Sequence, residues 1–256
     1  MTTEIRAETA ALAMVDFARG LRFEDLPAEV VEKAKLHLLD AIGIALASTK
    51  LEFGQAIHET VRAWGGTPES TLIGFGGKVP APSAALLNGS LIHGLDFDDT
   101  HLGAIIHVST VVVAAALAVG EARGVSGRDL IAALVAGNEV DIRIGLAAPS
   151  EFHHRGYHPT PICGPFAATI VTGRLSGHSR EAMANAMGVA GSQAAGIQEF
   201  LRDGSSVKRF HPGWAAHGGV IAAQVAANGL TGPARVLEGH YGLYNVLLGP
   251  GHFHEE

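Results

Sequence analysis

Residues 91–100 of this sequence, Leu-Ile-His-Gly-Leu-Asp-Phe-Asp-Asp-Thr, concentrate side chains that can carry out chemistry. One imidazole, three carboxylates and one hydroxyl lie within eight positions, and they belong to His93, Asp96, Asp98, Asp99 and Thr100. Carboxylates this close repel one another, and each is costly to bury without a partner. Such a cluster is typical of a proton donor or acceptor, a ligand sphere or a tight polar network, and all three interpretations are open at this point.

This cluster also has structural interpretations. Asp98 or Asp99 could cap the next helix, and His93 could be a buried imidazole with satisfied hydrogen bonds. The run Asp-x-Asp-Asp is also similar to acidic motifs that hold Mg²⁺ against a diphosphate in α-helical enzymes, but that chemistry needs a second ligand motif, and we find none. For the cluster as a whole, we favour a functional role.

A second polar segment, residues 151–160, contains three histidines. Adjacent His153 and His154 point in different directions, and no neighbouring cysteine completes a zinc spacing, so we predict no metal there. An exposed histidine-rich loop is the structural alternative. A catalytic His158 fits better, because Gly156 allows an unusual backbone and Pro159 fixes the start of the next helix.

A third segment, residues 205–214, places Lys208, Arg209 and a histidine just before a helix that we expect to begin at residue 213. The helix dipole and the two cations favour an anion at that position, and a solvated basic turn is the alternative. Residues 191–196 are glycine-rich, but no strand precedes them and no Gly-Lys-Ser/Thr follows. We therefore predict a helix crossing that needs small residues there, not a phosphate loop.

The composition limits the classes of protein. The 256 residues are 47% hydrophobic and 17% charged, with a net charge of −7 and no basic run, which argues against nucleic acid as a partner. A single cysteine, Cys163, excludes an internal disulfide and a self-contained iron–sulfur cluster. The first residues show no signal pattern, and the apolar stretch 108–122 is short for a membrane span. We expect a cytoplasmic protein without a membrane partner.

Helical periodicity runs through nearly the whole chain, which predicts a mainly α fold. One short strand is expected at 71–75, a histidine-rich loop at 149–160, and a turn or short strand with a last short helix at 234–248. Ser83, Ser126 and Ser179 are expected to cap helices. The predicted helices cover residues 5–20, 27–47, 52–64, 83–94, 109–123, 127–147, 164–175, 179–191 and 213–228.

The chain resembles the MmgE/PrpD family, which includes 2-methylcitrate dehydratase and cis-aconitate decarboxylase. The resemblance covers nearly everything from about residue 25 onward. It rests on motifs that occur in the family's order: residues 88–100, His107-Val-Ser109, Gly156-Tyr-His158-Pro-Thr160 before Gly164, residues 207–216, and Gly229-Leu-Thr231-Gly232-Pro233 with Leu237-Glu238-Gly239.

The resemblance implies a multi-helix, bundle-like domain spanning residues 1–256, like the N-terminal part of family members. In full-length members a smaller α/β domain follows and the active site lies between the two, whereas this chain ends where that domain would begin. The family's substrates are small di- and tricarboxylates, and its members are commonly homodimers. Five positions match the site residues of decarboxylase-like members: Asp96, Thr100, His107, His158 and Lys208. His101 is the alternative to His107.

The chemistry assigned to these positions follows from their types. His107 and His158 are the acid/base candidates, because imidazoles titrate near neutral pH. Lys208, with Arg209, would anchor a substrate carboxylate, and His93 would line the same pocket. Asp96 would orient a histidine or bind a substrate hydroxyl, and Thr100 would be its hydrogen-bonding neighbour.

We therefore expect a lyase domain that uses no metal and no cofactor. It would dehydrate a 2-methylcitrate-like acid or decarboxylate a cis-aconitate-like acid, and isomerase chemistry is a variant of the same steps. We expect activity to require a second domain, whether from the same protein or from a separate chain that forms a split enzyme. A non-catalytic, dimerising helical domain is the alternative from another class, and a Mg²⁺-dependent diphosphate enzyme is a more distant one.

Overall fold

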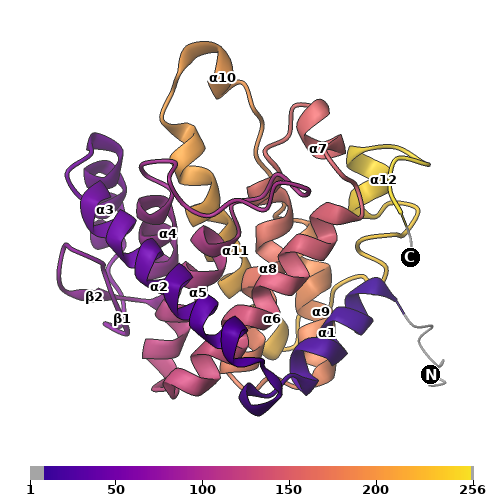
Figure 1. The fold of residues 1–256 in the computed structure, drawn as a ribbon, viewed down its shortest axis with the longest axis horizontal. Coiled ribbons are helices and arrows are strands. Elements are labelled where there is room, and N and C mark those ends of the chain that lie inside the picture. Colours follow the sequence, from indigo (N-terminus) through magenta and orange to yellow (C-terminus); the bar gives the residue numbers. More distant parts are fainter. Residues whose placement is uncertain (1–8, 255–256) are drawn as a thin grey trace.

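The computed structural model describes residues 9–254, and this part of the chain is mainly helical, as predicted (Figure 1). A 3-10 turn, Phe23–Asp25, lies between the first two helices. The α-helices are α1 Ala10–Gly20, α2 Ala28–Ser48, α3 Glu52–Trp64, α4 Ala81–Ile92, α5 Val108–Arg123, α6 Gly127–Leu146, α7 Glu151–His154, α8 Pro159–Leu175, α9 Arg180–Gly191, α10 Phe200–Asp203, α11 Val207–Ala227 and α12 Leu243–Leu247.

Helices α5 and α8 form the centre of the core. Helix α8 packs against α5, α6, α9 and α11, and α4 packs against both α5 and α11. Every residue from Val108 to Ala116 is buried, which is typical of a helix that is apolar on all sides and enclosed by others. The prediction of a buried helix at 108–122 is therefore confirmed. Within residues 9–254, no helix has the length and hydropathy needed to cross a bilayer.

Several predicted helix boundaries are confirmed. The third helix spans Glu52–Trp64, as expected. The hydroxyls of Ser126 and Ser179 accept hydrogen bonds from backbone N–H groups in the first turns of α6 and α9, so both serines are N-caps. The first helix begins at Ala10 behind an N-cap at Thr9, and residues 5–8 of the predicted helix lie outside the described residues.

The strand predicted at 71–75 is wrong in extent. Ser70–Thr71 (β1) pairs antiparallel with Lys78–Val79 (β2), and residues 73–75 form the turn between them. The predicted N-cap at Ser83 is also wrong, because α4 begins two residues earlier at Ala81. Pro82 lies in the first turn of α4, where the N–H that proline lacks would have had no helical partner.

The loop predicted at 149–160 contains the short helix α7. Helix α8 begins at Pro159, the residue expected to fix its start, although its predicted range began at residue 164. The helix expected at residue 213 begins at Val207, so Pro212 lies inside α11. The predicted helix crossing at 191–196 is instead the end of α9 and a loop, in which Gly196 has a φ of +149°. The earlier start of α11 places Lys208 and Arg209 in its first turn, where the dipole favours an anion.

A close approach between α4 and α11 brings their functional ends together. A Cβ atom added to Gly89 would lie 2.9 Å from the Cα atom of Gly213, so the two backbones pass almost in contact. His93 follows Gly89 by one helical turn, and Arg209 precedes Gly213 by one turn. The loop 93–107 and the first turn of α11 are therefore held side by side.

Candidate active site

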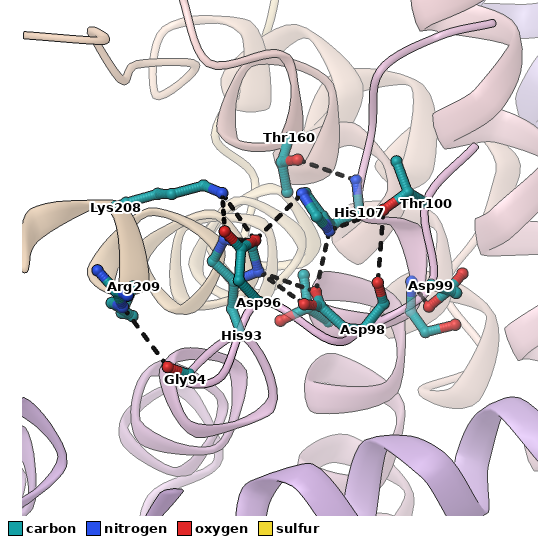
Figure 2. Close-up of polar contacts among 12 residues, drawn as sticks. His93, Gly94, Asp96, Asp98, Asp99, Thr100, His107, Thr160, Lys208 and Arg209 are labelled. Carbon is teal, nitrogen blue, oxygen red and sulfur yellow. Dashed lines mark hydrogen bonds and ion pairs between the residues drawn. The ribbon is translucent and has the colours of Figure 1, made fainter. Parts of the chain in front are cut away.

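The predicted site residues gather at one end of the bundle, where the loop joining α4 and α5 meets the N-terminal ends of α8 and α11 (Figure 1). The loop supplies His93, Asp96 and His107, His158 is the N-cap of α8, and Lys208 lies in the first turn of α11. Segments separated by more than 100 residues therefore contribute to one polar cluster (Figure 2).

The floor of the cluster is a buried imidazole–carboxylate pair. The Nδ1 atom of His93 lies 3.0 and 2.9 Å from the two carboxylate oxygens of Asp98. The His93 side chain is 0% exposed and that of Asp98 is 1% exposed, so the pair is shielded from water. Each partner satisfies the other, and Asp98 holds the His93 ring so that Nε2 is the nitrogen left available.

His107 lies above this pair and is held from several directions. Its Nδ1 atom lies 3.1 Å from the hydroxyl of Thr100, and its backbone N–H donates to the hydroxyl of Thr160. Its ring centroid is 4.5 Å from that of His93. Burial, with the nearby charges of His93 and Lys208, lowers the pKa of His107 below its ordinary value. The carboxylates of Asp98 and Asp96 act to raise this pKa, but their effect is smaller.

Lys208 and Asp96 form an ion pair at the mouth of the cluster, as Figure 2 shows. The Nζ atom of Lys208 donates to both oxygens of Asp96, at 2.7 and 2.6 Å. The Oδ1 atom of Asp96 also lies 3.6 Å from Nε2 of His107 and 3.8 Å from Nε2 of His93. Partial burial acts to raise the pKa of Asp96, but the bond and charge of Lys208, with the two histidines, lower it overall.

Asp96 has a φ of +59°, a left-handed conformation that costs free energy for residues other than glycine and that asparagine and aspartate tolerate best. Ile105, in the same loop, has a φ of +55°, which is rarer still for a β-branched residue. Two such residues in one loop show that its shape is imposed by its contacts, a pattern common at functional sites.

His158 is buried on the far side of the cluster. Its backbone N–H donates to the carbonyl of Gly196, and its Nδ1 atom lies 3.2 Å from Nδ1 of His211. Burial, together with the charges of His93, His211, Lys208 and His107, holds the pKa of His158 well below its ordinary range. Burial also lowers the pKa of His211 to about 4. Both rings are therefore neutral imidazoles at neutral pH.

The remaining predicted residues lie at the edge of the site. Asp99 accepts a hydrogen bond from the backbone N–H of Ser109, so its side chain satisfies a donor in the first turn of α5, as the structural interpretation expected. The Nε atom of Arg209 points at the carbonyl of Gly94, at 3.5 Å, and not at Asp96 (Figure 2). The ring of His101 accepts from the backbone N–H of Ala104, so His107 is the histidine in the cluster.

Sequence reasoning missed His211 and Thr160 as members of the site. His211 follows Lys208 by three positions, and Thr160 follows His158 by two, so each lies in a motif already singled out. For His211 the signal was a polar residue one helical turn from Lys208, and for Thr160 it was a hydroxyl in the first turn of a helix that starts earlier than predicted.

The arrangement combines several imidazoles, one ammonium group and the carboxylates of Asp96 and Asp98 within a few ångströms. This set can donate and accept protons and can neutralise an anion. One ring nitrogen from each of His93, His107 and His158 lies within 4.8 Å of the others, so these rings could also hold a metal ion. A hollow of about 550 Å³ lies beside β1 and α5, but the described residues that line it include no histidine and one ionisable residue, Glu121.

Comparison with known proteins decides the family. The sequence model of the MmgE/PrpD N-terminal domain matches residues 12–256. The chain belongs to the MmgE/PrpD family. The resemblance drawn from the motifs is therefore confirmed, and so is the helical fold expected of this domain.

Among the relatives of this MmgE/PrpD chain are the cis-aconitate decarboxylase-like protein oryM of Aspergillus oryzae, 30% identical over 246 residues, and the cis-aconitate decarboxylase of Aspergillus terreus, 30% identical over 245 residues. Each alignment covers 93% of this chain and 51% or 50% of the relative. The human cis-aconitate decarboxylase is 30% identical over 229 residues, which is 86% of this chain and 46% of that protein. The chain thus spans about half the length of these relatives.

Proposed function

We propose that this chain is the helical part of a metal-independent lyase that acts on a small di- or tricarboxylate. The observation that carries the proposal is the ion pair of Lys208 and Asp96 beside Nε2 of His107, because it joins an anion-binding group to an acid/base group. Relatives named cis-aconitate decarboxylase support the same reaction class. Family resemblance also supports a homodimer as the assembly.

Asp96 binds Lys208 at the position that a substrate carboxylate would take. A substrate carboxylate that displaces Asp96 gains a charge-assisted hydrogen bond from an ammonium that is already oriented. Asp96 also lies 3.6 Å from Nε2 of His107, so it is placed to orient that imidazole. A second carboxylate of the substrate would also bring negative charge to the buried histidines, which favours their protonated form.

Decarboxylation of a cis-aconitate-like acid then needs one proton. The bond between a methylene carbon and its carboxylate breaks, and CO₂ leaves. The electron pair forms a new double bond at the methylene, and the former alkene carbon takes a proton from an imidazolium, for which His107 and His158 are the candidates. Dehydration of a citrate-like acid uses the same groups, with one imidazole removing a proton beside a carboxylate and the other protonating the departing hydroxide. The chain's own groups therefore supply the steps of either reaction.

The test is turnover of cis-aconitate, 2-methylcitrate and citrate by the purified chain, alone and with a polypeptide that carries the rest of the relatives' length, with and without EDTA. The proposal predicts turnover of one of these acids that EDTA leaves unchanged and that His107→Gln abolishes. Lys50→Ala, an exposed lysine on the loop between α2 and α3, is the control for loss of a positive charge. Loss of turnover in EDTA would contradict the metal-independent mechanism.

The same assay separates the alternatives. If turnover requires a second polypeptide that carries the rest of the relatives' length, the chain is one half of a split or two-domain enzyme. If none of the acids is turned over with that polypeptide present, the lyase proposal fails and a non-catalytic, dimerising domain replaces it. Sedimentation equilibrium of the chain alone then measures whether it forms the expected dimer.

A further inference from the structure

The rings of His93, His107 and His158 are arranged so that one nitrogen from each lies within 4.8 Å of the other two. We propose that these three imidazoles form a binding site for a divalent transition-metal ion, such as Zn²⁺, and that a bound ion blocks the proposed acid/base chemistry. The site adds a form of regulation to the proposed lyase chemistry, and its inhibitory effect rests on that proposed function.

The hydrogen bonds of the three rings leave one nitrogen of each ring available to bind a metal. Nδ1 of His93 contacts Asp98, Nδ1 of His107 contacts Thr100, and Nδ1 of His158 contacts His211. Nε2 is then the nitrogen of each ring that a metal can bind. For His93 this atom is fully buried and has no hydrogen-bonding partner among residues 9–254. A buried polar atom without a partner costs free energy, and a bound metal ion would remove that cost.

The surroundings of His93 are those of a metal ligand. Histidines that bind metals almost always donate their second ring N–H to a carboxylate or carbonyl, which fixes the tautomer and makes the other nitrogen a better donor. Asp98 does this for His93 from within the core. The low pKa values of His107 and His158 keep both rings neutral, which is the form that binds a metal.

The donor set selects the kind of metal. Three imidazoles suit Zn²⁺, Co²⁺, Ni²⁺ or Cu²⁺, whereas Mg²⁺ and Ca²⁺ prefer oxygen ligands. Tetrahedral zinc with bonds of about 2.1 Å needs nitrogens about 3.4 Å apart, so the rings would close in by roughly 1 Å. The carboxylate of Asp96 lies 3.8 and 3.6 Å from Nε2 of His93 and His107, which makes it the natural fourth ligand.

A metal bound in this way would block the lyase chemistry. It would occupy the ring nitrogens that must exchange protons with the substrate. It would also bind Asp96, which could then no longer orient the imidazole of His107. The metal would therefore hold the side chains that the reaction needs.

Binding is tested on the chain itself in a buffer without carboxylates. Co²⁺ is added and its visible absorption recorded, then Zn²⁺ is added to displace it, and Zn²⁺ binding is measured by calorimetry. We expect one ion per chain and a Co²⁺ spectrum of four- or five-coordinate nitrogen ligation. His107→Gln should weaken Zn²⁺ binding at least about 100-fold, and Asp98→Asn about 10- to 100-fold through the His93 ring. Mg²⁺ should not bind.

His154→Gln is the matched control, because His154 is exposed in the histidine-rich segment and lies outside the cluster. Binding that survives in this variant and is lost in His107→Gln supports the site. No binding, binding retained in His107→Gln, or binding lost in His154→Gln would overturn it. Circular dichroism of each variant shows whether it is folded.

Inhibition is tested separately, at free Zn²⁺ concentrations fixed by a metal buffer. We expect turnover to fall as the site fills and to return on adding EDTA, and unchanged turnover with the site filled would overturn the inhibitory claim. A chain that binds Zn²⁺ through these histidines but turns over none of the acids supports the metal site and contradicts the proposed function instead.

Discussion

The Nζ atom of Lys208 lies 2.7 and 2.6 Å from the two oxygens of Asp96, although 112 residues separate them in the sequence. The pair closes the mouth of a cluster whose floor is His93 and Asp98. In the proposed enzyme this contact holds the anion-binding lysine in position before the substrate arrives.

Removing the lysine should weaken substrate binding. Lys208→Ala loses a charge-assisted hydrogen bond to a carboxylate, which contributes about 1.5–3 kcal/mol. We therefore expect the KM for the preferred acid to rise about 10- to 100-fold. Steady-state kinetics measure this, with Lys50→Ala as the control. An unchanged KM in Lys208→Ala would show that another cation holds the substrate.

Removing the negative charge of Asp96 should have the opposite effect on binding. Asp96→Asn keeps a residue that tolerates a φ of +59°, but it no longer neutralises Lys208. We expect propane-1,2,3-tricarboxylate, a saturated and unreactive acid, to bind more tightly to Asp96→Asn than to the unmodified protein. In this variant the ligand no longer competes with the Asp96 carboxylate for Lys208. Calorimetry measures the difference, and weaker binding would assign Asp96 a direct role in holding the ligand.

Asp141, in α6, should make stability depend on pH. Its carboxylate is fully buried without a hydrogen-bonding partner among the described residues, and burial, with the charge of Asp99, raises its pKa well above the ordinary value. The folded state then binds the proton more tightly than the unfolded state. The free energy of unfolding is highest below the unfolded pKa of about 4. It falls as pH rises toward the folded pKa, by about 1.4 kcal/mol for each pH unit between the two pKa values.

Asp141→Asn should remove this dependence. We expect the variant to have the same free energy of unfolding as the unmodified protein near pH 4 and a higher one at pH 8. Chemical denaturation at several pH values across that range measures both. Cys163 also faces this carboxyl, but its thiol is neutral over most of the window because burial raises its pKa. Asp40→Asn, on the exposed face of α2, is the matched control. A variant with the same pH slope as the unmodified protein would show that Asp141 is ionised in the fold.

The crossing of α4 and α11 should not tolerate a methyl group. In Gly89→Ala the new Cβ atom would lie 2.9 Å from a backbone atom of Gly213, so the helices must separate. We expect a loss of about 1–3 kcal/mol in the free energy of unfolding, which is usual for overpacking. Gly43→Ala, in the interior of α2 with open space around it, should instead stabilise by about 0.5–1 kcal/mol. Equal effects at the two positions would exclude a tight crossing.

Much of the fold could be predicted because its signals are local. Apolar periodicity gave the extent of α3, and serine side chains marked the starts of α6 and α9. The start of α11 was misjudged because Pro212 resembles a first-turn proline. It lies instead in the sixth position, where it removes the bond that the carbonyl of Lys208 would otherwise accept. The strand at 71–75 was too long because its apolar residues pack in a turn.

The sequence was enough to predict which residues belong to the site, but not which of them contact one another. The motifs identified the histidines, Asp96 and Lys208, but the pairing of Lys208 with Asp96 depends on how α4 and α11 cross, and no local pattern contains that information. For the same reason His211 was not identified as the partner of His158. The role of Arg209 as a second carboxylate anchor stays a prediction.

The most direct measurement of the central claim is NMR of the histidine Cε1–H groups while propane-1,2,3-tricarboxylate is added. A polycarboxylate site between Lys208 and the buried rings predicts that the signals of His93, His107, His158 and His211 shift together and saturate, and that Lys208→Ala abolishes the shifts. Saturable shifts confined to histidines outside the cluster, such as His153 and His154, would contradict the account, as would shifts that persist unchanged in Lys208→Ala.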